Sequence, residues 1–598
     1  MYILAGGNAR RVLHVISIIA CMQLARGFPF IHICKAAARK RSLLMVRSQC
    51  PAILFVFTLY ILSAQSQSAS VGNEPTPGPV VFTRSGYVRG LREVVEGRSL
   101  DVFYGIPYAE PPVGPLRFKK PVPTMSWSAP LDATEKKPSC VQFSGSSVMS
   151  QIQPSDDVMS EDCLHLNIWA PTGGKSKAVI IFLYGGGFQW GSNRWLQHDA
   201  RYLAALGDVV LVAPNYRVGV LGFLNGRNAN IPGNAGVWDT LLALRWVKCN
   251  VLEFGGNPDM ITVMGESAGA VITGLLMISP VSELLFRRAI MQGGSPFWYL
   301  GNTTGSGPST VNSVALKLGC GVTFKDNPSE VVQCLRNASA SDLVNKTSTL
   351  FGILPYQLFP SYSDRLFPEP HITMITKGPI RDVDLLIGSN ADEGAFFALP
   401  TLKWLLGENY YDKLSKRKLI STFTVYIQIV TGFDAKDLVK SYFEGLEETD
   451  KTGVLKAVAK VMGDYAISCP ALFLADEVSR DRTNAVYFYE FSYRPTRSTW
   501  PPWVQATHSQ ELEFTLGSVF LFADEFSDDD RQLSRDIIQT WTSFAKTGKP
   551  SPLRGTQWEK YTPLKKAHLR INSETSVVAV SHRPRCDLLK KYIKQYFE

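Results

Sequence analysis

A serine flanked by glycines is the residue in this chain best suited to covalent chemistry. Ser267 is the centre of the stretch 265–269, GESAG, between a strand-like run and a helix-like run. The two glycines let a strand and a helix cross closely at a sharp turn, which forces the serine outward. The backbone N–H of Ala268 then points to where an oxyanion would form, near the positive end of the helix dipole. The pattern also fits an ordinary tight turn, so it indicates a nucleophile without proving one.

Three consecutive glycines could supply further oxyanion donors. Gly185, Gly186 and Gly187 directly follow an apolar, strand-like run. Such a run loses much conformational entropy on folding, so it usually serves a close backbone approach. Two of its N–H groups could join that of Ala268 in holding a negative oxygen. A flexible turn is the alternative, and a phosphate-binding loop would need a Lys and a Ser or Thr that are missing here.

A histidine late in the chain is the candidate base. Where a serine between two glycines at a strand–helix turn is the nucleophile, its partners follow it in the chain. The acid comes second and the histidine last. Among the eight histidines, His508 lies in a loop after the strand-like stretch 485–491 and before a helical stretch, where a base belongs. His568 and His582 also follow, and we expect both at the surface.

Two neighbouring carboxylates are candidates for the acid. Asp392 and Glu393 lie in the turn after the strand-like stretch 384–390. Either could orient the imidazole, and their position does not choose between them. The alternative is that both are solvated turn residues.

Together these residue types indicate acyl transfer. His508 would take the proton from Ser267 as the serine attacks an ester carbonyl, and backbone donors would stabilise the tetrahedral intermediate. Water would then cleave the acyl-enzyme with the same histidine as base. This chemistry requires no metal ion and no cofactor.

The elements that must hold these residues alternate between strand and helix. Apolar runs typical of strands occupy residues 80–90, 101–109, 164–171, 178–186, 208–217, 260–267, 288–294, 384–390 and 485–491. Stretches with helical spacing lie at 238–254 and 534–548. Several strands are almost continuously apolar, as in a parallel sheet that is covered on both faces. This order predicts a doubly wound α/β fold, with ligands beyond the carboxyl ends of the strands.

The formal charge of +10 does not indicate a nucleic-acid partner. Residues 1–50 carry eight of the 62 Lys and Arg and no Asp or Glu, which leaves 54 basic against 52 acidic residues in the remainder. A nucleic-acid binder should carry a basic face on its folded part. We therefore expect no nucleic-acid binding.

The N-terminus has the plan of a secretory leader. An apolar run at 51–62 follows basic residues and precedes small polar ones, and it is too short to span a bilayer comfortably. We expect a leader at 1–69, with Met45 a possible start, and a single catalytic domain at 78–598. An N-terminal membrane anchor is the alternative. We expect no membrane span in the mature chain.

Several motifs together resemble those of the type-B carboxylesterase and cholinesterase family, which has the α/β-hydrolase fold. The matching stretches are 103–121, 160–171, 184–188, 215–224, 254–270, 392–397 and 508–517, within a resemblance that covers about residues 80–598. The resemblance implies a Ser267–Glu393–His508 triad, since the family carries its acid on the residue before the glycine of DEG. It also implies Gly186, Gly187 and Ala268 as oxyanion donors.

The resemblance further implies a disulfide framework, with the pairs Cys140–Cys163, Cys320–Cys334 and Cys469–Cys586. That pairing leaves Cys249 as a free thiol, either a partly buried helix residue or an intermolecular link. Three glycosylation sequons, at Asn302, Asn337 and Asn345, agree with export. We therefore expect a secreted protein that is a monomer or a weak homodimer.

The candidate substrate pocket consists of Glu266, beside the nucleophile, with Trp298, Phe396 and Phe397. Phe396 and Phe397 match positions that line the family's gorge, and Trp298 would shape the acyl pocket; the alternative is that all three aromatics are core residues. Cholinesterases stack choline on a tryptophan between the first two paired cysteines, and the loop 141–162 has none. Because an aromatic face binds a quaternary ammonium well, we expect a general carboxylesterase. The alternatives are a choline-ester hydrolase and a non-catalytic adhesion or sequestering protein.

Overall fold

The structure is a computed structural model, and it describes most of the chain after residue 77. The described residues are 78–143, 153–298, 307–348, 358–362, 364–378, 380, 382–407, 409–431, 434–481, 483–562, 564–580 and 583–594. The expected leader, Asn302, His582 and part of the loop 141–162 lie outside them. Residues Pro79–Glu598 form one compact unit.

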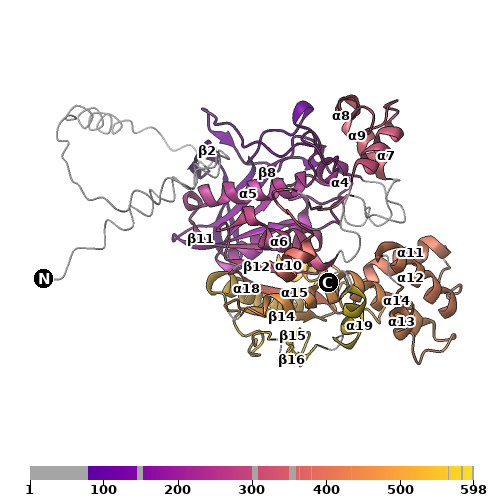
Figure 1. Cartoon of the computed structure of the whole chain (residues 1–598). Helices are drawn as coiled ribbons and strands as arrows, with labels where there is room; N and C mark the ends of the chain where they lie inside the picture. Colours follow the sequence, from indigo (N-terminus) through magenta and orange to yellow (C-terminus); the bar gives the residue numbers. More distant parts are fainter. Residues whose placement is uncertain are drawn as a thin grey trace, which may run out of the picture. The chain divides into compact units, whose positions relative to one another are not determined.

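An eleven-stranded mixed sheet is the centre of this unit (Figure 1). Its order is β16-β15-β14-β13-β12-β11-β9-β10-β8-β4-β3. The strands are β3 (Leu91–Val95), β4 (Arg98–Pro107), β8 (His165–Pro171), β9 (Lys177–Leu183), β10 (Val210–Pro214), β11 (Gly256–Glu266), β12 (Arg288–Gln292), β13 (Asp384–Asn390), β14 (Val486–Phe491), β15 (Ala567–Ile571) and β16 (Ser576–Ala579). Two small sheets contain β1 (Val80–Thr83), β2 (Gly86–Arg89) and β5 (Leu131–Asp132), and β6 (Ser139–Cys140) and β7 (Met159–Ser160).

The middle of the large sheet is parallel and its two edges are antiparallel. Neighbouring strands from β10 through β9, β11, β12, β13 and β14 to β15 all pair in parallel. The edge strands β8, β4, β3 and β16 pair antiparallel. Every residue of β10, and all but the first of β9 and β13, is buried. Strands buried on both faces are what the near-continuous apolar runs predict, and the α/β-hydrolase prediction is confirmed.

The helices lie between and beside these strands, and two groups of them extend beyond the sheet (Figure 1). They are α3 (Arg201–Gly207), α4 (Gly219–Phe223), α5 (Ala235–Asn250), α6 (Ala268–Ile278), α7 (Pro308–Leu318), α8 (Pro328–Asn337), α9 (Ala340–Ser348), α10 (His371–Lys377), α11 (Ala395–Leu406), α12 (Lys416–Thr431), α13 (Lys436–Ser441), α14 (Lys451–Gly463), α15 (Cys469–Val478), α16 (Leu512–Thr515), α17 (Ser518–Leu521), α18 (Asp528–Thr547) and α19 (Arg583–Lys594). Helix α6 packs on β11 and β12, and α18 packs on β9 and β11.

The parallel strands bring the candidate catalytic residues to one edge of the sheet. Ser267 directly follows β11, Glu393 lies in the turn after β13, and His508 lies in the loop between β14 and α16. The glycine run follows β9. Because all four strands run in the same direction, these loops meet at their carboxyl ends.

Three disulfides join Cys140 to Cys163, Cys320 to Cys334, and Cys469 to Cys586, and these are the pairs that the resemblance implies. The expectation of a free thiol at Cys249 is wrong, because Cys249 is disulfide-bonded. The other described cysteines pair with one another.

Two other expectations concern burial. His568 lies in β15 and is only 1% exposed, so the expectation of a surface group is wrong. Asn337 and Asn345, which carry sequons, are exposed on α8 and α9.

One described helical run, Lys451–Val478, is long and apolar enough to cross a membrane, but 83% of its apolar window is buried inside the protein. That burial is typical of a core helix.

Candidate active site

The turn at Ser267 is held by two close backbone approaches. Ser267 has a φ of 53° and joins the end of β11 to the start of α6. A Cβ atom on Gly265 would lie 2.2 Å from the carbonyl oxygen of Gly269, and one on Gly269 would lie 2.0 Å from that of Leu183. Only glycine fits at these two positions, so the strand and helix cross as the motif predicts. Ser267 remains partly exposed although both its neighbours are buried.

A short chain of hydrogen bonds connects the serine, the histidine and the glutamate. Nε2 of His508 lies 2.8 Å from Oγ of Ser267, and Nδ1 lies 2.5 Å from Oε2 of Glu393. The backbone N–H of Asn390 donates to Oε1 of the same glutamate at 2.7 Å. Both Glu393 and His508 are buried, so the contact between the carboxylate and the imidazole is shielded from water.

The neighbouring Asp392 faces elsewhere. Its Oδ2 accepts a hydrogen bond from the backbone N–H of Gln505 at 2.8 Å, and its Oδ1 lies 3.5 Å from Nζ of Lys460. Position in the sequence left Asp392 and Glu393 equivalent, and the structure brings only Glu393 to the imidazole.

The glycine run lies against the serine turn. A Cβ atom on Gly185 would lie 2.8 Å from Cβ of Ser267, so this approach also requires glycine. Gly186 and Gly187 have φ values of 113° and 59°. Among the described residues, the N–H groups of Gly186, Gly187 and Ala268 donate to no acceptor. They are therefore available to an oxygen atom of a ligand.

Two further buried glutamates surround His508. Glu266 Oε1 lies 3.4 Å from Nε2 of the histidine, and it accepts a hydrogen bond of 2.5 Å from the hydroxyl of Ser509. Glu511 accepts a hydrogen bond from the side-chain amide of Asn390. Sequence reasoning did not single out Ser509 or Glu511, although both lie in the stretch 508–517 that carries the resemblance.

Burial and mutual charge shift the pKa values of this cluster. Burial, together with the charges of Glu266 and Glu393, raises the pKa of Glu511 to about 8. Burial also raises the pKa of Glu266, against the opposing effects of His508 and Ser509. Burial alone would lower the pKa of His508, but the charge and hydrogen bond of Glu393, with the other two glutamates, raise it above its ordinary value.

Aromatic rings lie beside His508 and beside the glycine run. The ring centroids of Phe397 and Phe396 lie 5.1 and 5.6 Å from that of His508. On the side of the glycine run, Trp298 lies 6.0 Å from Phe188, the residue after Gly187. Trp298, Phe396 and Phe397 are each partly exposed, so none of the three is a fully buried core residue.

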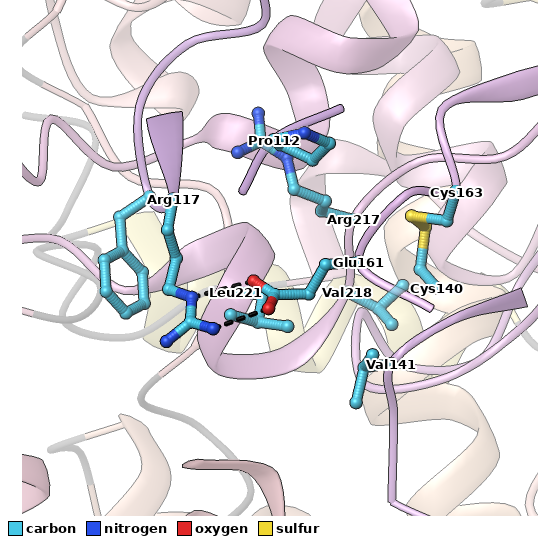
Figure 2. Close-up of a pocket in the computed structure, with 10 residues that line it drawn as sticks. Pro112, Arg117, Cys140, Val141, Glu161, Cys163, Arg217, Val218 and Leu221 are labelled. Carbon is cyan, nitrogen blue, oxygen red and sulfur yellow. Dashed lines mark hydrogen bonds and ion pairs between the residues drawn. A yellow bond between two sulfur atoms is a disulfide. The ribbon is translucent and has the colours of Figure 1, made fainter. Parts of the chain in front are cut away.

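A separate pocket shares none of these residues. Figure 2 shows Arg117 in a two-point ion pair with Glu161, beside the Cys140–Cys163 disulfide. The same guanidinium donates to three carbonyl oxygens at the end of α8 and just beyond it, those of Leu335, Arg336 and Ala338. The charge of Arg117 is thus used within the fold, and this pocket has a structural explanation. The described residues include no group of three or more His, Cys, Asp or Glu that could hold a metal ion.

Comparison with known proteins identifies the family. A model of the carboxylesterase family matches residues 77–589. Similar proteins include acetylcholinesterase-1 of Trittame loki, 32% identical over 86% of this chain and 94% of that protein. They also include the cholinesterase of Mus musculus, 34% identical over 87% of each chain, and the acetylcholinesterase of Leptinotarsa decemlineata, 34% identical over 84% of each. The chain therefore belongs to the carboxylesterase family and is a carboxylic ester hydrolase.

Proposed function

We propose that the chain is a secreted serine esterase that works through Ser267, Glu393 and His508 and an acyl-enzyme intermediate. The observation that carries the proposal is the continuous hydrogen-bonded chain from Oγ of Ser267 through His508 to Glu393, with contacts of 2.8 and 2.5 Å. A serine is a weak nucleophile until a base within hydrogen-bond reach accepts its proton. The buried carboxylate fixes the imidazole tautomer and stabilises the imidazolium.

The reaction divides into two similar halves. His508 accepts the proton of Ser267 as Oγ attacks the ester carbonyl, and it returns that proton to the leaving alcohol as the C–O bond breaks. Water then attacks the acyl-enzyme with His508 again as base. The N–H groups of Gly186, Gly187 and Ala268 would hold the oxyanion in both halves, because they have no other acceptor among the described residues.

We propose a neutral ester as the substrate. A quaternary ammonium binds best over an aromatic face, and residues 141–162 contain no tryptophan. The aromatic rings at Phe396, Phe397 and Trp298 suit an aliphatic or aromatic acyl or alcohol group. Hydrolysis of choline esters is the second candidate, because the three relatives above are named as cholinesterases.

Secretion is part of the proposal. Three disulfides among the described residues agree with an oxidising compartment. The asparagines of two sequons, Asn337 and Asn345, are accessible to a glycan. The apolar run at 51–62 would direct export.

The test compares two substrates on one purified protein. A chromogenic short-chain ester and acetylthiocholine are assayed side by side with wild type and Ser267→Ala. We expect hydrolysis of the simple ester by wild type, weak activity on acetylthiocholine, and loss of both in the variant. Equal rates on the two substrates would contradict the neutral-ester proposal, and full activity in the variant would contradict the serine mechanism.

A further inference from the structure

Ser509, which follows His508, has a backbone conformation that normally belongs to glycine. Its φ is 69°, where a Cβ atom crowds the adjacent backbone. A serine held in this region is a local strain, and such strain persists where the surroundings or the function require the side chain. The hydroxyl of Ser509 donates a hydrogen bond of 2.5 Å to Oε1 of Glu266. The strained residue is therefore tied to the glutamate that precedes the nucleophile.

Glu266 and Ser267 face the same nitrogen of His508. Nε2 lies 2.8 Å from Oγ of Ser267 and 3.4 Å from Oε1 of Glu266. On its other side Glu266 is confined, because a Cβ atom on Gly185 would lie 2.2 Å from Oε2. The carboxylate is buried and lies between Gly185 and Ser509, so its position relative to Nε2 depends on these two neighbours.

The position of Glu266 matters once His508 carries the proton of Ser267. A carboxylate is a stronger acceptor for an imidazolium N–H than an alcohol or ester oxygen. If Oε1 closed on Nε2, the resulting ion pair would keep the proton on His508 and delay its transfer to the leaving group. The hydrogen bond from Ser509 occupies the same oxygen that would make this contact.

We propose that Ser509 is a positioning residue whose hydroxyl holds the Glu266 carboxylate back from His508, so that Nε2 exchanges its proton with Ser267 and the leaving alcohol. The proton moves from Oγ to Nε2 and then to the alcohol oxygen, and neither Glu266 nor Ser509 gains or loses one. This inference rests on the proposed function and adds a residue that the triad does not include.

The surroundings of His508 fix the direction of the expected effect. Among the described residues, the charged groups that act on the imidazole include Glu393, Glu266 and Glu511. The buried Tyr489 of β14 lies near the same three glutamates. Ser509 stabilises the anion of Glu266. Removing its hydroxyl raises the proton affinity of the Glu266–His508 pair, whichever of the two holds the proton. The base must be proton-free to act, so activity on the acidic side must fall.

The test is the pH profile of kcat/KM for a short-chain ester with wild type, Ser509→Ala and Ser509→Gly. Both variants remove the hydroxyl, but only glycine relieves the backbone strain. We expect both to move the acidic limb to higher pH by about half a unit or more, and thus to lower kcat/KM below the limb about threefold or more. In a Glu266→Gln background, where no carboxylate can close on Nε2, the Ser509→Ala change should add no shift.

Three outcomes overturn the proposal: an unshifted limb in both variants, a wild-type profile restored by glycine alone, or an equal shift in the Glu266→Gln background. Thermal unfolding of each variant shows whether it is folded. If Ser509→Ala does not fold, the pH profile of Ser509→Gly provides the test. Failure of the proposed function itself is distinct, because wild type would then show no turnover or Ser267→Ala would retain it.

Discussion

Gly269 and Leu183 approach so closely that a Cβ atom on the glycine would lie 2.0 Å from the carbonyl oxygen of Leu183. This contact joins the helix after Ser267 to the strand before the glycine run. A Cβ atom and a backbone carbonyl oxygen cannot rotate away from each other, so the backbone itself would have to move. We predict that Gly269→Ala lowers the free energy of unfolding by about 3 kcal/mol or more. Denaturant unfolding of the purified variant checks this.

Gly187→Ala is the matched control. A Cβ atom on Gly187 would meet no atom within 4 Å, although its φ of 59° still disfavours alanine. We expect a loss of only about 1 to 2 kcal/mol. Because Gly187 is a proposed oxyanion donor, a backbone shift that relieves this strain would displace its N–H, so kcat/KM should fall more than stability does. Equal stabilities of the Gly269 and Gly187 variants would contradict the packing argument.

Glu393→Gln removes the carboxylate that contacts Nδ1 of His508. Without it the imidazole loses its fixed tautomer and the stabilisation of its charged form, so we predict that kcat falls about a hundredfold or more. Steady-state kinetics on a short-chain ester measures this. Asp392→Asn is the control, since Asp392 faces Gln505 and Lys460, and it should retain most activity.

The pH dependence of the wild type follows from the same cluster. Since the pKa of His508 is raised by its three glutamates, and since the base must be neutral, we predict an acidic limb of kcat/KM above the ordinary imidazole value of about 6.5. Glu393→Gln removes the strongest of these charges, so its residual activity should have a limb at lower pH. A limb that stays fixed would show that Glu393 does not control the base.

A disulfide that closes a long loop should contribute more to the free energy of unfolding than one that closes a short loop. Cys469–Cys586 closes a separation of 117 residues and Cys320–Cys334 one of 14. In the chain-entropy description the longer loop contributes about 2 kcal/mol more. Replacing both cysteines of each pair by serine, and comparing unfolding in denaturant, tests the ranking. The reverse order would indicate that strain or residual structure outweighs loop entropy here.

Much of the fold was predictable because buried parallel strands leave a clear pattern. The runs that became β9 and β10 are almost wholly apolar, and both strands lie in the sheet. The antiparallel edges and the order of strands depend on pairing between distant segments, which apolar runs do not encode. His568 illustrates the limit: we expected it at the surface, but it lies in β15, which pairs with β14 and β16, and it is buried.

The site was predictable where a residue type and its turn coincide, as for Ser267 and the glycines around it. Position alone did not choose between Asp392 and Glu393, because both lie in one turn. The resemblance implied Glu393, and in the structure Glu393 is the one that contacts His508. Ser509 and Glu511 were missed because their roles depend on contacts across the site. Cys249 was misjudged because the pairing implied by the resemblance left it over, and a count of paired cysteines does not show whether the remaining one is bonded.

The most direct test of Ser267 as the nucleophile is covalent labelling. Wild type is incubated with an organophosphate ester until turnover of a short-chain ester stops, and the modified peptide is identified by mass spectrometry. We predict one phosphoryl group per chain, carried by Ser267, and no labelling of folded Ser267→Ala. A label on another residue, or hydrolysis that continues after Ser267 is fully modified, would contradict the assignment.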